Sequence, residues 1–517
     1  MHLSLNNSLG KWILPKEPAP FSPEATNYFS RLDAAGDTTY VDYRQPLANY
    51  IDSLVSLGGA YWDTMESAAS FVGVGIQGIT VPLRDGMPVL TENNFIDLDL
   101  DQLTGLKGNS TSGKYLSTNT DTTDYAQNDN SLSFYVTDLD TATSADQSIL
   151  CGIRSGTGGN PFHFQYRSSA QRIDARNFSG GGAGGVSSAD GFFGSARDNS
   201  SNFTYRRDST DLAVAIVSGA QANADLLLFA ADNTIGGSVG SYSDARLATY
   251  HVGPALDLAT LEGLQETLLS EIRTAHTFVA AASYFSRLAA AGDTTHVAYK
   301  QPLTNYITSL VELGGAYWDK MESSTSFVGV GIQGITVPLR DGMTVPTQNN
   351  FVAADLDQLT GLKGDASTKY ISTGLIGTDL AQNDNSISAH ITEVQTAGSY
   401  IAGSGEFPDV CNHLLVVGGN YEVRNMSATR LPVGAIATGL FGSSRSVSTG
   451  YDYIVGGSTG SKTLTSAAPS TKAYSVFASS AALPTDVRLA TYHAGPALNL
   501  ATLEGLQDTL ITEIAAI

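Results

Sequence analysis

Two glycine-rich segments, Gly73–Gly78 and Gly329–Gly334, match the GxGxxG pattern of dinucleotide-binding loops. That pattern binds pyrophosphate where it leaves a strand and opens a helix. Here each segment follows a predicted helix and runs into the letters ITVPLRDG, where Pro82 or Pro338 prevents a helix from continuing. We therefore interpret both segments as turns and expect no cofactor.

Two further segments, Gly236–Gly240 and Gly456–Gly460, match the GxSxG pattern of serine hydrolases. A nucleophile elbow needs a strand before the serine and a helix after it. Both segments lie in Gly/Ser-rich stretches with no helical pattern behind them, and His251 and His493 lie in predicted structural strands. We expect loops here, no Ser-His-Asp site and no enzymatic activity.

Alternating carboxylates at Asp97, Asp99 and Asp101 have the residue type that hard cations prefer. Calcium takes six to eight oxygen ligands, so three local carboxylates are too few. The second copy of this segment also has Ala353 in place of Asp97. We interpret these residues as solvated loop carboxylates and expect no metal site.

Aromatic and basic residues are interleaved between Phe162 and Phe178, and again near Tyr205. Aromatic faces and arginine donors suit sugar rings or anionic glycans. The alternative is that the aromatic residues form a sandwich core and the arginines line its solvated face. The residues that could contact a glycan are Tyr166, Arg167, Arg176, Tyr205, Arg206, Tyr421, Arg424, Tyr451 and Tyr453.

These candidates lie in a chain that contains the same unit twice. Ser70–Met87 recurs letter for letter at Ser326–Met343, and Arg246–Leu268 returns almost intact at Arg488–Leu510. Such self-similarity predicts one structural unit used twice. The predicted organisation is a proline-rich arm (1–27), a helical hairpin (28–92), a β-sandwich (93–256), a connecting helix (257–291), a second hairpin (284–348), a second sandwich (349–498) and a closing helix (499–517).

The periodicity of apolar residues assigns the elements within each repeat. Leu47, Tyr50, Ile51 and Leu54 follow Pro46 at helical spacing. In Ser131–Asp138 apolar and polar residues alternate, which predicts a strand with one buried and one solvated face. Leucines and isoleucines from Leu503 to Ile517 form a heptad-like seam that could pack on its own sandwich or in a multi-chain bundle. The predicted fold class is mainly β with flanking helices.

The overall composition excludes several classes of function. A net charge of −22 argues against nucleic-acid binding, which needs clustered Lys and Arg. The two cysteines, Cys151 and Cys411, do not correspond between the repeats, so we expect buried thiols. No apolar run is long enough to cross a bilayer, and the first residues lack the pattern of a secretory signal.

The order of motifs in each repeat resembles phage-encoded virion structural proteins with a concanavalin A-like (laminin G-like) domain. The segments that carry the resemblance are Gly105–Gly108, Lys114–Tyr115, Gln127–Asp129, Gly191–Arg197 and Arg246–Leu258, and in the second repeat Gly361–Gly364, Lys369–Tyr370, Gln382–Asp384, Gly439–Arg445 and Arg488–Leu500. The resemblance implies a jelly-roll sandwich in each repeat and brings no catalytic residues.

The resemblance also implies a function. We expect a non-enzymatic component of the virion surface, on the head or the tail, such as a fibre, spike or decoration protein. The arm and helices would bind other virion proteins, the sandwiches could bind host-surface glycans, and the chain would form a homo-oligomer, with a trimer as our expectation. The alternatives are a secreted bacterial lectin or adhesin and, less favoured, an enzyme acting on polysaccharide.

Overall fold

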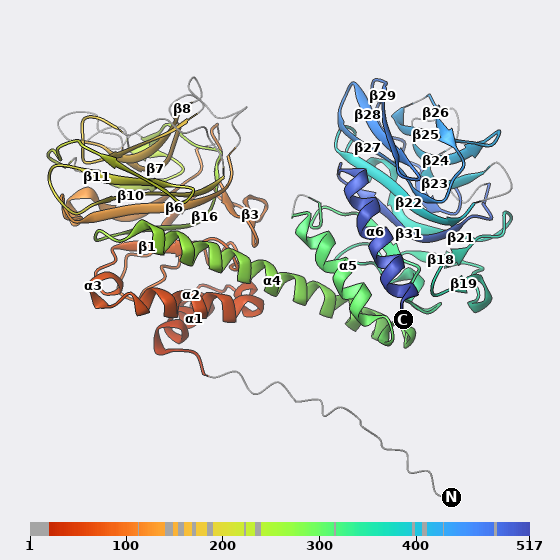
Figure 1. Cartoon of the computed structure of the whole chain (residues 1–517), viewed down its shortest axis with the longest axis horizontal. Helices are drawn as coiled ribbons and strands as arrows, with labels where there is room; N and C mark the ends of the chain where they lie inside the picture. Colours follow the sequence, from red (N-terminus) through yellow and green to blue (C-terminus); the bar gives the residue numbers. More distant parts are fainter. Residues whose placement is uncertain are drawn as a thin grey trace, which may run out of the picture. The chain divides into compact units, whose positions relative to one another are not determined.

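The computed structural model divides the chain into two compact units, Met1–Ile272 and Arg273–Ile517. We describe each unit by itself (Figure 1). The residues that the structure describes are 20–111, 113–139, 148–153, 160–167, 172–182, 190–221, 224–232, 239–314, 317–394, 399–405, 411–427, 429–479 and 483–517.

The first unit holds two antiparallel sheets and a short hairpin. One sheet has the order β12-β11-β10-β6-β16-β4-β3, with β1 also paired to β16, and the other has the order β2-β5-β13-β7-β8-β9. The strands are β1 (Ser67–Ser70), β2 (Thr91–Asn93), β3 (Leu100–Asp101), β4 (Gly105–Lys107), β5 (Tyr115–Asp121), β6 (Asn130–Asp138), β7 (Ser148–Ile153), β8 (Phe162–Arg167), β9 (Arg172–Asn177), β10 (Gly191–Arg197), β11 (Phe203–Arg207), β12 (Thr210–Val214), β13 (Asp225–Leu228), β14 (Ala231–Asp232), β15 (Val239–Gly240) and β16 (Arg246–Gly253).

The second unit repeats this plan. Its sheets have the orders β19-β20-β31-β22-β27-β28-β29, with β17 paired to β31, and β18-β21-β30-β23-β24-β25-β26. The strands are β17 (Ser323–Ser326), β18 (Thr347–Asn349), β19 (Leu356–Asp357), β20 (Gly361–Lys363), β21 (Tyr370–Ile376), β22 (Asn385–Glu393), β23 (Tyr400–Ser404), β24 (Cys411–Val417), β25 (Asn420–Ser427), β26 (Leu431–Ala435), β27 (Gly439–Val447), β28 (Gly450–Val455), β29 (Ser458–Thr463), β30 (Ala473–Val476) and β31 (Arg488–Gly495). The predicted fold class, mainly β with sandwiches and flanking helices, is confirmed.

Helices flank the sheet that contains β16 or β31. They are α1 (Pro23–Ala34), α2 (Arg44–Ser56), α3 (Gly59–Trp62), α4 (Leu258–Ala290), α5 (Lys300–Glu312) and α6 (Leu500–Ala515), with short 3-10 helices η1 (Thr39–Tyr43), η2 (Asp97–Asp99), η3 (Thr122–Asp124), η5 (Thr295–Val297), η6 (Gly334–Thr336), η7 (Ala353–Asp355) and η8 (Gly377–Asp379). The predicted stripe of α2 is buried at Leu47, Tyr50, Ile51 and Leu54. The division of the chain falls inside α4, where the sequence predicts a connecting helix.

The first helix begins earlier than the sequence analysis expected. We placed residues 1–27 in an extended arm, but α1 starts at Pro23. Ser22 caps the helix by accepting a hydrogen bond from the Ala25 amide, and proline is well tolerated at the first helical position. The arm prediction is therefore wrong for residues 23–27, and residues 1–19 lie outside the described part.

The glycine-rich GxGxxG segments pack on a buried aspartate. Asp37 accepts hydrogen bonds from the amides of Thr39 and Gly75, both at 2.8 Å. A Cβ at Gly78 would lie 2.2 Å from the Asp37 carboxylate. The glycines allow this close approach, which explains the motif without a nucleotide. The segment follows strand β1 directly, whereas the sequence analysis placed it after a helix.

A helix covers part of the second face of the central strand. Leu132, Phe134 and Val136 of β6 point into the sandwich and are fully buried, as predicted. Ser133, on the opposite face, is also fully buried. The closing helix covers this face: a Cβ at Gly194 of the neighbouring strand would lie 2.9 Å from Leu258 of α4. The prediction of a solvated face is therefore wrong at Ser133, beneath α4, whereas Tyr135 and Thr137 on the same face keep intermediate exposure.

The closing helix of the second unit packs on its own sandwich. Leu503, Leu510 and Ile514 of α6 are fully buried, and α6 contacts β27 and β28. Ile517, the last residue of the predicted seam, is 67% exposed. Of the two arrangements that the sequence left open, this structure has the first.

A buried arginine that donates to backbone carbonyl groups joins the two sheets of each sandwich. Arg197 of β10 is fully buried and donates to the Asn177 carbonyl of β9 at 2.9 Å and to the Asn202 carbonyl at 3.0 Å. Its guanidinium lies 5.3 Å from the Phe203 ring centroid. Arg445 repeats the arrangement, with 2.8 Å to the Asn425 carbonyl. A buried charge is tolerated when its donors are satisfied.

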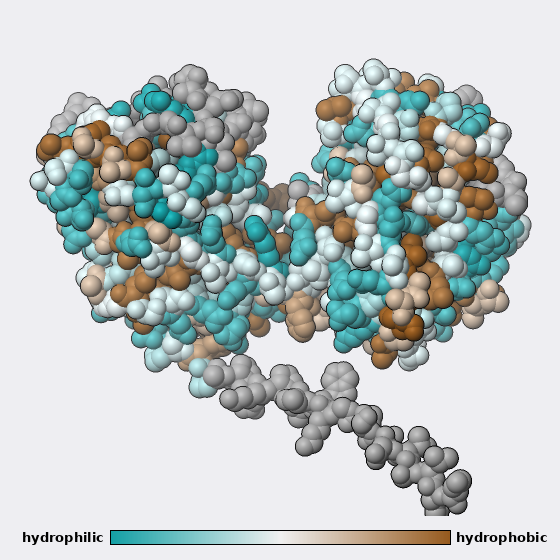
Figure 2. Space-filling view, viewed as in Figure 1, coloured by the Kyte–Doolittle hydropathy of each residue, from teal (hydrophilic) through white to brown (hydrophobic). Residues whose placement is uncertain are grey.

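None of the described helices combines the length and apolar character needed to span a bilayer. On the face seen in Figure 2, polar and apolar residues are intermixed over each unit. Cys151 is buried, which raises the pKa of its thiol.

Candidate binding site

Most of the predicted glycan contacts are buried. The exposed fractions of Tyr166, Tyr205, Tyr421 and Tyr451 are 0%, 2%, 1% and 3%. Tyr421 stacks on Phe441 with ring centroids 4.2 Å apart, and burial raises its pKa to about 12. These rings belong to the sandwich interior, so their prediction as a binding surface is wrong. The alternative reading, that they form the core, is confirmed.

Two of the predicted arginines are buried as well. Arg424 is 2% exposed, and Arg206 is 7% exposed. The Arg206 guanidinium donates to Glu262 of α4 at 2.8 Å and to Asp211 of β12 at 2.8 Å. Both are wrong as surface contacts: Arg206 lies beneath α4, and Arg424 is buried in β25 of the other sheet of its sandwich.

Three predicted residues keep some exposure, two of them in the first unit and one in the second. Arg167 forms an ion pair with Asp174 of the neighbouring strand, and Arg176 is half-buried on the same strand pair. Tyr453 lies in the second unit, in β28, with the Lys462 ammonium 5.5 Å from its ring centroid. They stay predictions.

The most suggestive concave site lies where the closing helix begins. In the second unit a pocket of about 550 Å³ is bounded by β27, β28, β29 and the first residues of α6. The polar residues that line it are Ser444, Ser446, Asp452, Tyr453, Thr459, Ser461 and Asn499. We call it the helix-start pocket. It offers hydroxyl, carboxylate and amide groups side by side.

The first unit has a pocket at the equivalent place. It measures about 330 Å³ and is lined by Ala196, Asp198, Thr204, Asp211, Ala255, Leu256, Asp257 and Leu258. The strand pairing makes the correspondence explicit: Ala196 pairs with Thr204, as Ser444 pairs with Asp452. The shape therefore recurs in both repeats, while the residues that line it differ.

The local contacts hold these groups in place. Ser461 donates to Asp452 at 2.7 Å, and Ser444 accepts from the Leu498 amide at 2.9 Å. Asn499 caps α6 by accepting from the amides of Ala501 and Thr502. In the first unit Asp257 accepts from the Thr260 hydroxyl at 2.7 Å, a hydrogen bond that lowers the pKa of this aspartate.

A glutamate of the closing helix holds the hairpin beside each pocket. Glu262 accepts from the Ser209 amide at 2.9 Å, and Glu504 accepts from the Gly457 amide at 2.8 Å. Both hairpins turn through two residues at positive φ, Asp208–Ser209 and Gly456–Gly457, as in a type I′ turn. The helix therefore fixes the position of the hairpin that forms the pocket wall.

The remaining sequence candidates have structural roles. The buried His251 and His493 bond to tyrosines of α2 and α5, with Nε2 2.5 Å from the Tyr50 hydroxyl and 2.6 Å from the Tyr306 hydroxyl. Ser458 opens β29 in a hairpin with no helix behind it, and the first GxSxG serine lies outside the described residues.

Two of the three alternating carboxylates bind neighbouring groups. Asp99 accepts from Lys114 at 2.6 Å, and Asp101 accepts from the amides of Leu103 and Thr104. Within the described part of the chain, no three His, Cys, Asp or Glu side chains gather as metal ligands.

Sequence reasoning missed the helix-start pocket because its walls come from distant segments. Asp452 and Asn499 carry no recognisable spacing. One usable signal lies in the nearly identical segments Arg246–Leu268 and Arg488–Leu510, where Asp257 of the first corresponds to Asn499 of the second. That difference lies at the pocket in both repeats.

No protein-family model and no curated protein matches the chain. Solved structures with similar folds include the mouse laminin α1 chain domains LG4-5 (11% identity, TM-score 0.21, 72% of this chain and 84% of that chain). They also include the botulinum neurotoxin serotype D binding domain (6% identity, TM-score 0.30, 80% and 93%). A third is Trypanosoma rangeli sialidase in complex with sialic acid (11% identity, TM-score 0.29, 69% and 54%), so the match spans about half of the sialidase chain. With TM-scores below 0.5, the architecture rests on the sheets described above, and these matches carry no argument about function.

Proposed function

We propose that the chain is a non-enzymatic carbohydrate-binding protein whose two sandwiches each present a helix-start pocket to a glycan. The observation that carries the proposal is the recurrence of this pocket at one place in both repeats, although its lining has diverged. Adjacent hydroxyl, carboxylate and amide groups suit polyols, which need both donors and acceptors.

Two weak sites on one chain would bind a repeating polysaccharide more tightly than either site alone. The first pocket is lined by the carboxylates of Asp198, Asp211 and Asp257, whereas the second is richer in hydroxyl groups. The two repeats would therefore prefer different sugars, with neutral sugars in the second.

The finer proposal is that the chain belongs to the surface of a phage particle, as a head or tail fibre, spike or decoration component that attaches to host glycans. It rests on the motif order of Gly191–Arg197 and Arg246–Leu258 in both repeats. The arm and helices would bind other virion proteins in a homo-oligomer, for which the resemblance suggests a trimer.

The binding test uses the full chain on an array of neutral and acidic bacterial oligosaccharides, followed by calorimetry with each positive glycan. Asp452→Asn/Ser461→Ala should raise the Kd about tenfold for a glycan held by the second unit, and Asp198→Asn should do so for the first. Asp42→Asn, on exposed η1, is the matched control and should change nothing. Binding that none of the pocket variants weakens would refute the site.

Two further measurements test the rest of the proposal. Release of reducing sugar from a bound polysaccharide, stopped by an Asp or Glu substitution, would establish the enzyme alternative instead. Mass spectrometry of purified phage particles should detect the chain. Detection only in the culture medium would favour a secreted lectin or adhesin.

A further inference from the structure

The two repeats treat one glutamate of the closing helix differently. In the first unit Glu262 is 3% exposed and binds the Arg206 guanidinium through contacts of 2.8 and 2.7 Å. Arg206 also pairs with Asp211 on the neighbouring strand. The chain thus supplies its own cation to this carboxylate.

The second unit keeps the glutamate but not the cation. Glu504 Oε1 accepts from the amides of Gly457 at 2.8 Å and Leu440 at 3.2 Å. The strand register places Ile454 and Thr459 where the first unit has Arg206 and Asp211. Neither side chain can neutralise the carboxylate.

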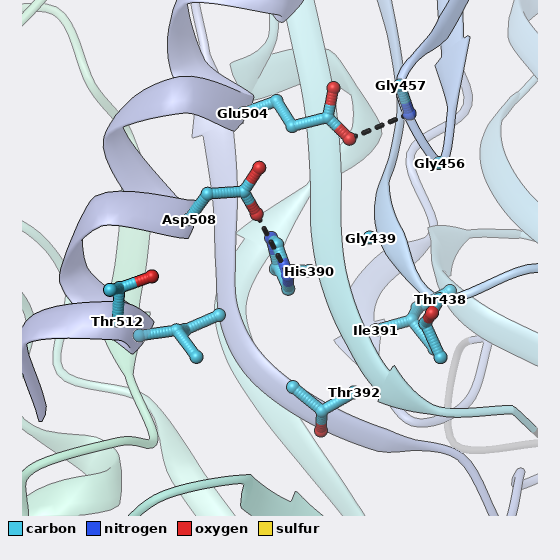
Figure 3. A pocket seen from close by; sticks show the side chains of 11 residues that line it. His390, Ile391, Thr392, Thr438, Gly439, Gly456, Gly457, Glu504, Asp508 and Thr512 are labelled. Atoms are coloured by element: carbon cyan, nitrogen blue, oxygen red, sulfur yellow. Dashed lines mark hydrogen bonds and ion pairs between the residues drawn. The ribbon is translucent and has the colours of Figure 1, made fainter. Parts of the chain in front are cut away.

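A pocket of about 630 Å³ opens beside Glu504, between α6 and the strands β22 and β27. Figure 3 shows Asp508 projecting from the helix towards His390 on the sheet, and Glu504 projecting towards Gly457. Three threonines complete the polar lining: Thr392, Thr438 and Thr512. Among the described residues that line the pocket, the carboxylates of Glu504 and Asp508 are the charged groups at neutral pH.

His390 does not balance those charges. Its ring is 4% exposed, and burial lowers its pKa, so it is neutral at pH 7. Its Nε2 lies 3.6 Å from Asp508, farther than a hydrogen bond. The pocket therefore has a net negative charge and unused acceptors.

We propose that this pocket binds a small organic cation, whose guanidinium or primary ammonium group contacts the carboxylates of Glu504 and Asp508. The comparison between the repeats carries the inference: the same glutamate binds a guanidinium in one unit and faces a pocket in the other. A planar guanidinium or a compact ammonium could each bind the carboxylates, as part of an alkylguanidine or an amino sugar.

The test titrates the full chain, by calorimetry and ligand-observed NMR, with ethylguanidinium and with glucosamine. Their neutral isosteres, N-ethylurea and N-acetylglucosamine, are the ligand controls. We expect at least one cation to bind at one site per chain and its isostere to bind at least tenfold more weakly. The cation that binds identifies the source of the charge. Failure of both cations, or equal binding of an isostere, would overturn the proposal.

Variants locate the site. Asp508→Asn, at a side chain that is 61% exposed and outside the hairpin contacts, should weaken binding about tenfold without unfolding the unit. Ile454→Arg should abolish binding by restoring the internal guanidinium. Glu266→Gln, at the position in the first unit that matches Asp508, should leave the affinity unchanged. Cation binding that persists in both Asp508→Asn and Ile454→Arg would place the site elsewhere and refute the inference.

Discussion

The two repeats share contacts in their helical base and differ at the hairpin above the last helix of the repeat, α4 or α6. In the base, Arg31 donates to the carbonyls of Pro82 and Leu83 at 3.0 Å each, and Arg287 makes the matching contacts at 3.1 and 2.9 Å. At the hairpin, by contrast, Arg206 and Asp211 of the first unit correspond to Ile454 and Thr459 of the second, where a pocket opens beside Glu504.

The contrast shows that the contacts in the base are needed for folding, whereas the side chains at the hairpin can vary. Contacts in the base satisfy buried polar groups, and losing one leaves its partner unsatisfied in a dry interior. The hairpin lies at the surface, where the glutamate contact to the turn is sufficient to hold the backbone.

The largest expected effect lies in a feature that both units share. Arg197→Leu and Arg445→Leu should each lower the free energy of unfolding of their own unit by more than about 3 kcal/mol, because each leaves several buried carbonyl groups without a donor. Calorimetric scans should show the same loss of unfolding free energy in both variants, in the transition of the first unit for Arg197→Leu and of the second unit for Arg445→Leu. Arg445→Lys keeps the charge but not the forked geometry, so its unfolding free energy should lie between those of the wild type and Arg445→Leu. Unequal losses for the two leucine variants would mean that the sandwiches are not equivalent.

The next effect should differ between the units. Glu262→Gln leaves Arg206, whose side chain is 9% exposed, with Asp211 alone and should cost about 3 kcal/mol. Glu504→Gln weakens contacts to two backbone amides and should cost about 1 kcal/mol. Urea denaturation of both variants measures the difference. Equal costs would contradict the ion-pair contrast.

A smaller effect concerns pH. Burial lowers the pKa of both His251 and His493 to about 3, below the value near 6.5 of an unfolded chain. Between these values the unfolded state binds a proton that the folded state does not, so stability falls as the pH drops from 6.5. The loss should be about 1.4 kcal/mol per pH unit for each histidine.

Urea midpoints at pH 7, 6 and 5 test this slope. The double variant Tyr50→Phe/His251→Leu removes both polar groups from one site and should flatten the slope by the share of one histidine. An unchanged slope would show that His251 is not the group that titrates. The matching double variant Tyr306→Phe/His493→Leu should have the same effect, although His493 Nδ1 also bonds Ser324 at 2.8 Å, where the first unit has Ala68.

Much of the fold could be predicted from the sequence because periodicity and repetition are local signals. The alternation in β6 identified which residues point into the sandwich, and the stripe of α2 identified a packing face. The same patterns could not show that helices cover the second face of β6, since Ser133 is polar and still fully buried. A polar residue on a strand can be buried when a helix packs on that face of the sheet.

The site was less predictable for a related reason. The predicted contacts are tyrosines and arginines, and residue type alone does not show which face of a strand a side chain occupies. Tyr205 and Arg206 are neighbours in the chain but point to opposite sides, one into the core and the other beneath α4. Both pockets depend on strand register between segments far apart in sequence. The sequence separation of Glu504 and Gly457 gives no sign that the fold places them in hydrogen-bond contact.

In both units the strand made last occupies a middle position in its sheet. β16 lies between β6 and β4 and also pairs with β1, and β31 repeats this in the second unit. A ribosome adds roughly 5–20 residues per second, so β6 waits on the order of ten seconds for this partner. During that time its edge is open to pairing with other nascent chains. Holdase chaperones should therefore engage each repeat during synthesis and release it when the RLATYH strand emerges.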